Sequence, residues 1–139
     1  MQQENTLADL FGEPIYTYTR QNALDDGVLI DVTEASKEAG FSIPVAVTST
    51  VWDKYIEWTQ DDTDRQTYQD QSGRLWDVLW MARMGITEAN KGQSQILYEF
   101  YCVPRGGKAR KARRTTLKLH IGPGDDPKPV MTIMLLNED

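Results

Sequence analysis

The sequence is poor in the side chains that most often carry catalysis or bind metals. Its 139 residues include one cysteine, Cys102, and one histidine, His120. A single cysteine excludes an internal disulfide and fits a reducing cytoplasm. One cysteine and one histidine are also too few for a zinc site of the usual kind within one chain. We therefore expect a cytoplasmic protein with no metal and no cofactor.

Long apolar runs are missing as well. No run approaches the ~20 residues that a membrane-spanning helix needs, and residues 1–5 lack the basic start of a signal peptide. We therefore expect no membrane partner. The chain does contain 40% hydrophobic residues and four tryptophans, which indicates a packed core. This length fits one domain, in which residues 1–15 would form an N-terminal arm.

Acidic residues are absent from one stretch, residues 105–114, which holds six of the fifteen Lys and Arg side chains. The other 129 residues carry nine basic and twenty-one acidic side chains. An acidic body repels polyanions, whereas a concentrated basic segment attracts them. We name residues 104–114 the basic hairpin loop. It predicts contact with nucleic acid or a nucleoprotein complex through these residues: Arg105, Lys108, Arg110, Lys111, Arg113 and Arg114.

Other interpretations of the basic hairpin loop are open at this point. The loop could bind an acidic protein, fold back onto the protein's own acidic surface, or remain solvated. It contains no aromatic residue, so stacking on bases would have to come from Tyr98 or Tyr101. The acidic body offers the opposite hypothesis, in which carboxylates imitate the phosphates of DNA. The residues for that role would be Asp25, Asp26, Asp31, Asp61, Asp62, Asp64 and Asp70.

The N-terminal two thirds show mainly helix signals. Thr19 is a plausible N-cap for a helix at 20–25, and residues 28–32 read as a short strand. Pro44 makes residues 43–47 extended and disfavours a central strand. The polar residues 61–70 are expected to form an exposed connection or a solvated turn. Further helices are predicted over residues 34–39, 50–59 and 72–84.

The C-terminal third changes to a period of two. Strands are predicted over residues 95–103, 115–121 and 130–136, with a dense turn signal at 122–127. Short connections predict an antiparallel meander, with the basic hairpin loop joining its first two strands. The fold class is therefore α+β, a sheet packed against two or more helices. Because the helix at 72–84 is apolar around most of its circumference, Trp76 and Trp80 are expected in the core.

The runs Gly73–Ala82 and Ile121–Met134, together with single residues between Tyr18 and Val32, carry a further signal. They resemble an uncharacterised bacterial family, the domain of unknown function 6573. The resemblance implies a bacterial, mobile-element setting such as a plasmid or phage, and it implies no catalytic residues. Small accessory proteins in that setting often counter host defence. We therefore expect a non-enzymatic accessory protein that inhibits restriction or CRISPR systems. The single residues that share the resemblance are Tyr18, Thr19, Arg20, Ala23, Leu24, Asp26, Gly27, Asp31 and Val32.

A polar cluster within these runs supports an alternative. Arg20, Asp31, Arg74 and Asp77 could form a pocket of a small-ligand-binding protein or enzyme, or a buried network that holds the fold. Strand alternation places Cys102 and His120 on opposite faces, which argues against a nucleophile–base pair. A third class of function is an oligomeric adaptor, because the sequence leaves the oligomeric state open.

Overall fold

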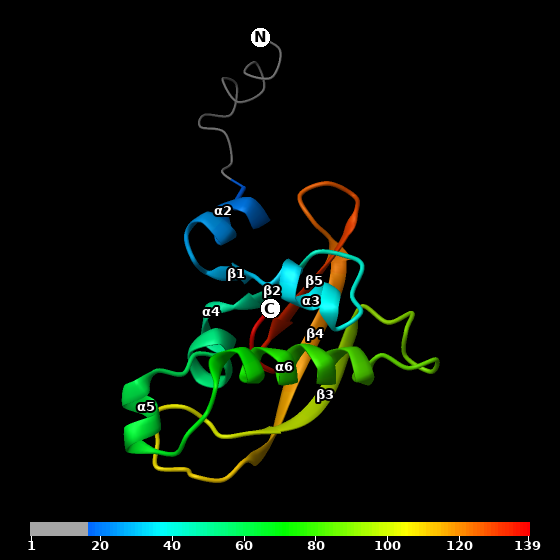
Figure 1. The fold of residues 1–139 in the computed structure, drawn as a ribbon. Coiled ribbons are helices and arrows are strands. Elements are labelled where there is room, and N and C mark those ends of the chain that lie inside the picture. Colours follow the sequence, from blue (N-terminus) through cyan, green and yellow to red (C-terminus); the bar gives the residue numbers. More distant parts are fainter. Residues whose placement is uncertain (1–16) are drawn as a thin grey trace.

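A computed structural model describes residues 17–139 of the chain. Within them, five strands form one mixed sheet in the order β1-β2-β5-β4-β3 (Figure 1). The expected meander is confirmed, because β4 pairs antiparallel with both β3 and β5. The sheet is mixed, not purely antiparallel as predicted, since β2 runs parallel to β5 and carries β1 at its outer edge. The strands are β1 (Leu29–Asp31), β2 (Val45–Thr48), β3 (Gln95–Cys102), β4 (Arg113–Pro123) and β5 (Pro129–Met134).

The helices of residues 17–139 are short except for one. Thr19 caps the first of them in a reciprocal capping box with Asn22, as its position predicts. The expected helix at 50–59 is instead a single α-turn followed by a π-helical turn. The bounds are α2 (Arg20–Asp25), α3 (Thr33–Glu38), α4 (Ser49–Val51), η1 (Trp52–Ile56), α5 (Gln60–Arg65) and α6 (Gln71–Gly85). None of these helices is long and apolar enough to cross a membrane.

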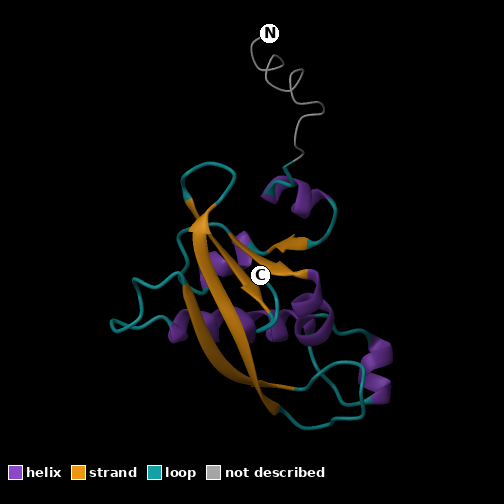
Figure 2. Ribbon diagram, turned by 180° about the vertical axis from the view of Figure 1, so that it is seen from behind, coloured by secondary structure: helices purple, strands orange, loops and turns teal. Residues whose placement is uncertain are grey.

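Helix α6 covers one face of the sheet, as Figure 1 shows. β3 alternates strictly between exposed and buried residues, and its buried side faces the core. The face expected from alternation is confirmed, with Ile96, Tyr98 and Phe100 buried beside Leu117 and Leu119. The view from behind, in Figure 2, shows the other face of the sheet with α6 beyond it. We call this second face the outer face.

The position of β2 contradicts the expectation drawn from Pro44. All four residues of β2 are buried, and the strand lies between β1 and β5 inside the sheet. Pro44 lies just before the strand, where its missing N–H breaks no ladder bond. Its carbonyl still accepts a hydrogen bond from the Met131 amide at 2.9 Å. A proline next to a strand therefore does not force that strand to the edge.

The tryptophans of α6 are the second correction. The buried side of α6 consists of Val78, Leu79 and Ala82 together with Arg74. Trp76 and Trp80 are each 39% exposed on the side of the helix that the core does not cover. Their rings stack on one another, with centroids 5.4 Å apart and planes 13° from parallel. The pair thus shields part of its own apolar surface without entering the core.

The predicted N-terminal arm, residues 1–15, lies outside the described residues. The five described strands form one sheet, and α6 covers one face of it. The main core cluster draws on every strand from β2 to β5 and on α6. The fold therefore positions two exposed features, which are the basic hairpin loop at one end of β3 and β4 and the outer face of the sheet.

Candidate functional site

The basic hairpin loop packs against α5 (Figure 1). The centre of this contact is Gln66, which directly follows α5 and is only 1% exposed. Its amide group donates to the carbonyls of Pro104 at 2.9 Å and Ala109 at 2.8 Å. Its carbonyl oxygen accepts from the Gly106 amide at 3.0 Å. One buried side chain therefore satisfies three backbone groups of the loop and fixes its course.

A second anchor comes from Arg105, the first of the predicted contact residues. Its Nε donates to the Asp62 carboxylate at 2.8 Å, and its Nη1 lies 3.4 Å from Glu57. Asp62 and Glu57 raise the pKa of Arg105, mainly through the hydrogen bond that Arg105 donates to Asp62. Arg105 therefore holds the loop in place, and its predicted contact with nucleic acid stays a prediction. The interpretation that the loop folds back onto the protein's own acidic surface holds for Arg105.

Asp62 belongs to a segment that we expected to be exposed, yet it is buried. Thr59 and Asp62 form the capping box of α5. Burial raises the pKa of the Asp62 carboxyl, but hydrogen bonds from Thr59 and Arg105 outweigh burial, so its pKa lies below the usual value. The aspartate thus joins the helix terminus to the loop. This role also removes Asp62 from any set of solvent-facing phosphate mimics.

Acidification should weaken this anchor. Because the pKa of folded Asp62 is lowered, its stabilisation is complete above the unfolded-state pKa of about 4 and is lost as the pH falls below it. Urea unfolding of the parent and of Asp62→Asn at pH 6 and pH 3 measures this loss. The parent's stability advantage over the variant should be smaller at pH 3 than at pH 6. A stability difference that does not change with pH would contradict the assignment.

A small apolar cluster supplies the third anchor. Ala109 of the loop is buried with Trp58 and Val103. The small Ala109 side chain therefore faces inward, while the residues on either side of it, Lys108 and Arg110, are exposed. Burial of Ala109 therefore directs the neighbouring Lys108 and Arg110 side chains toward solvent. The loop is consequently ordered with its charges on the outside.

Five cations of the basic hairpin loop remain exposed. Within residues 17–139, none of the five forms an ion pair or a side-chain hydrogen bond. Two of them lie in β4, not in the connection, because Arg113 pairs with Cys102 and Arg114 pairs with Tyr101. The exposed cations are Lys108, Arg110, Lys111, Arg113 and Arg114.

Arg74 joins α6 to the start of the same loop. It is 4% exposed, and its guanidinium donates to the carbonyls of Ile56 at 3.1 Å and Val103 at 2.8 Å. Its centre lies 4.4 Å from the Trp58 ring, a cation–π contact. Burial lowers the pKa of Arg74 despite nearby acidic groups. Arg74 therefore holds the fold, as in the interpretation of a buried network, although its main partners are carbonyls.

The polar cluster predicted from sequence separates into two parts. Arg74 and Asp77 lie together near the basic hairpin loop, in a pocket of about 320 Å³ that Arg110 also lines. Arg20 lies elsewhere, on the outer face, where it donates to the Thr132 hydroxyl at 2.7 Å and the Met131 carbonyl at 3.0 Å. Asp31 accepts hydrogen bonds from the amide and hydroxyl of Thr33. Of the four predicted residues, the structure therefore places Arg74 and Asp77 beside the basic hairpin loop.

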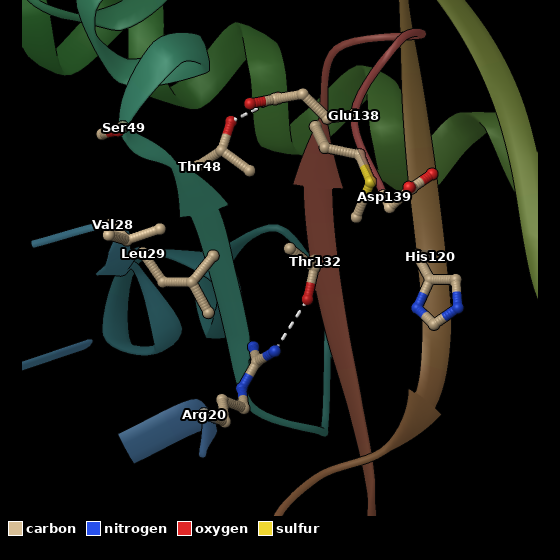
Figure 3. A pocket seen from close by; sticks show the side chains of 10 residues that line it. Arg20, Val28, Leu29, Thr48, Ser49, His120, Thr132, Glu138 and Asp139 are labelled. Atoms are coloured by element: carbon tan, nitrogen blue, oxygen red, sulfur yellow. Dashed lines mark hydrogen bonds between the residues drawn. The ribbon is translucent and has the colours of Figure 1, made fainter. Parts of the chain in front are cut away.

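The pocket around Arg20 is shown in Figure 3. Its volume is about 450 Å³, and His120 and Thr132 line it from β4 and β5. Glu138 lies on its opposite side, where it accepts hydrogen bonds from Thr48 at 2.8 Å and Thr50 at 2.5 Å. Burial lowers the pKa of Arg20 against the opposing effect of Asp125 and Asp31. Arg20 and Glu138, which carry charge in this pocket, thus already have hydrogen-bond partners within the protein.

The two residues considered for nucleophilic chemistry do not meet. His120 pairs with Gln95, seven positions along β4 from the partner of Cys102. Cys102 is buried and lies 3.4 Å from the Thr115 hydroxyl, and burial raises the pKa of its thiol. Between residues 17 and 139, no group of three or more His, Cys, Asp or Glu side chains is placed to hold a metal ion. The turn residue Asp125 accepts hydrogen bonds from the backbone amides of Arg20 and Gln21 at the start of α2.

Some functional residues could not be found from sequence. Gln66 gives no local signal, because a buried glutamine in a polar segment looks like any surface glutamine. The Thr59-x-x-Asp62 spacing is a recognisable capping signal, but it does not reveal Arg105 as partner. Of the two tyrosines considered for stacking, Tyr98 is buried and donates to the Val78 carbonyl. Tyr101 is 66% exposed, so only this one can meet a ligand.

Comparison with known proteins gives one family. The chain matches none of the curated proteins and none of the solved structures. The model of a family of unknown function, DUF6573, matches residues 8–139. The match covers all described strands and helices, including the basic hairpin loop and α6. The chain therefore belongs to the DUF6573 family.

Proposed function

We propose that this protein binds nucleic acid, free or within a nucleoprotein complex, through the exposed cations of the basic hairpin loop. One observation carries the proposal. Arg105 is neutralised by the fold, whereas the five other cations are exposed and have no partner among residues 17–139. A polyanion is the ligand class that such a cluster attracts from solution. We propose a non-enzymatic role, in which binding itself is the activity.

The order of the loop supports this proposal. Gln66, Arg105 and Ala109 fix the loop from within, so the cations are displayed on a defined backbone. Preorganisation lowers the entropic cost of binding compared with a loop that must first become ordered. The rest of the molecule is strongly acidic. A nucleic acid would therefore approach from the loop end and avoid the body of the protein.

Neutralising four cations tests the proposal. The variant Lys108→Gln, Arg110→Gln, Lys111→Gln, Arg113→Gln should lose salt-dependent binding. With four phosphate contacts, the affinity of the parent should fall about 100-fold when the salt concentration rises from ~50 to ~200 mM. Fluorescence anisotropy with labelled DNA and RNA measures both affinity and salt slope. Because none of the four side chains forms an ion pair or hydrogen bond within the described part of the chain, the melting temperature should stay unchanged.

A matched control separates the loop from net charge. Lys37, Lys91 and Lys128 are exposed and Arg83 is half-buried, and none of the four bonds to the loop within the described residues. Their replacement by glutamine changes the net charge equally. This control should bind as the parent does. Equal binding by all three proteins, or no binding by the parent at ~50 mM salt, would contradict the proposal. A host-defence complex of the restriction or CRISPR type is the specific nucleoprotein that we propose to test next.

A further inference from the structure

A groove runs beside the basic hairpin loop, along the first half of α6. It consists of two adjoining pockets of about 320 and 300 Å³. The two pockets share Gln69, Arg74 and Asp77 as lining residues, so they lie side by side. Arg110 lines the first pocket, which places one exposed cation of the loop directly at the groove. The first volume lies at the lower end of the ~300–1,000 Å³ range of small-ligand pockets.

Aromatic side chains line both parts of the groove. Tyr101 lines the first pocket and is 66% exposed, while Tyr68 and Trp76 line the second. Tyr68 is 75% exposed. Exposed rings beside a cationic surface are the usual means by which proteins stack unpaired bases. In a duplex the bases are stacked on each other and unavailable to such rings.

Asp77 gives the groove a specific polar character. Its carboxylate is exposed, and within residues 17–139 it has no hydrogen-bond or ion-pair partner. Arg74 lies next to it in the groove, but its guanidinium is directed to the Ile56 and Val103 carbonyls. Asp77 is therefore free to accept two hydrogen bonds from a ligand, because an ionised carboxylate only accepts. Partial burial raises the pKa of Asp77, with Arg74 opposing that effect.

Among the nucleobases, guanine fits such an acceptor. Its Watson–Crick edge presents two adjacent donors, the N1–H and the exocyclic N2–H, which match the two oxygens of a carboxylate. Adenine and cytosine each place one amino group beside a ring acceptor, which would face a carboxylate oxygen unfavourably. We propose that this groove binds an unpaired guanine of a single-stranded nucleic acid. The proposal rests on the proposed function, because the phosphates of that strand would lie on Arg110 and its neighbouring cations.

The charge distribution around the groove determines on which side the base and the phosphate backbone of a bound nucleotide lie. Asp70 and Asp77 lie at the α6 side, while Arg110 lies at the loop side. Phosphates are repelled from the first side and attracted to the second, so the base points toward α6 and the backbone stays on the loop. Base and backbone thus contact different elements of the protein. Substitutions in the two places should therefore have separable effects.

The experiment uses fluorescence anisotropy of the full chain with labelled oligothymidylates that carry one central guanine, adenine, cytosine or inosine. The guanine strand should bind about 10-fold more tightly than the adenine and cytosine strands. Inosine retains N1–H and lacks the N2 amino group, so its strand should fall between them. A duplex of the same length should bind more weakly than the guanine strand.

Two substitutions assign the effect to the groove. Asp77→Asn should abolish the preference for guanine while the strands still bind, and Tyr101→Ala should weaken single-strand binding without affecting the duplex. Asp64→Asn is the control, since it removes one exposed carboxylate from α5, outside the groove. It should keep the guanine preference.

The outcomes distinguish this inference from the proposed function. Binding that requires the loop cations but shows no base preference would overturn the groove assignment and leave the proposed function intact. A guanine preference that persists in Asp77→Asn would also overturn the groove assignment. Absence of any binding at ~50 mM salt would contradict both.

Discussion

Replacement of Arg74 by methionine should lower the free energy of unfolding by about 3 kcal/mol. The guanidinium donates to the carbonyls of Ile56, Val103 and Lys54 and also contacts Gln69. Methionine fills part of the space but leaves these buried acceptors without donors. Loss of the 4.4 Å contact with the Trp58 ring adds to the cost. Urea unfolding followed by tryptophan fluorescence measures the change.

A lysine at this position should not restore stability. A lysine ammonium is a compact group with three donors, and it cannot reproduce the planar fork that reaches acceptors on η1 and on the start of the loop at once. Arg83→Met is the control, because Arg83 lies on the same helix, is half-buried, and its side chain forms no hydrogen bond or ion pair among the described residues. The control should cost less than about 1 kcal/mol. Similar losses in the two variants would mean that Arg74 contributes only its packing.

Replacement of Gln66 by methionine should have the second largest effect, about 2–3 kcal/mol. Two carbonyls and the Gly106 amide lose their partner together, and the site is too buried for water to replace the side chain freely. Amide hydrogen exchange should show faster exchange at Gly106, whose N–H donates to this glutamine. Gln60→Met is the control, because Gln60 is exposed at the start of α5.

The Gln66 substitution also links stability to function. All five exposed cations remain in this variant, so a purely electrostatic contact would keep its salt slope. A loosened loop must be ordered on binding, which should reduce affinity at every salt concentration. A variant with unchanged exchange at Gly106 would show that Arg105 and Ala109 alone are sufficient to hold the loop.

Several parts of the fold could be predicted because they depend on local patterns. The alternation of apolar and polar residues in β3 is enough to identify its buried face, and the cap at Thr19 follows from its own side chain and Asn22. The position of β2 could not be predicted in this way. Its place depends on pairing with β5, more than eighty residues later in the chain, and no local signal encodes that contact.

The Trp76 and Trp80 pair shows a different limit. An apolar helix usually indicates burial, but a sheet can cover only one side of a single helix. The sequence places more apolar surface on α6 than the core accepts, and ring stacking accommodates the remainder. In the candidate site, the cationic segment was visible from composition, whereas its division into one structural arginine and five exposed cations was not. That division depends on Asp62 and Glu57, which are distant in sequence.

The place of β5 in the sheet has a consequence for how the domain folds. β5 follows the other strands in the chain, yet it lies at the centre, between β2 and β4. The β1–β2 pair and the β3–β4 hairpin do not touch as strands until β5 is inserted between them. Many contacts therefore join residues far apart in sequence, which favours slow folding. Because β5 joins the β1–β2 pair to the β3–β4 hairpin, the two halves of the sheet should also fold and unfold as one cooperative unit.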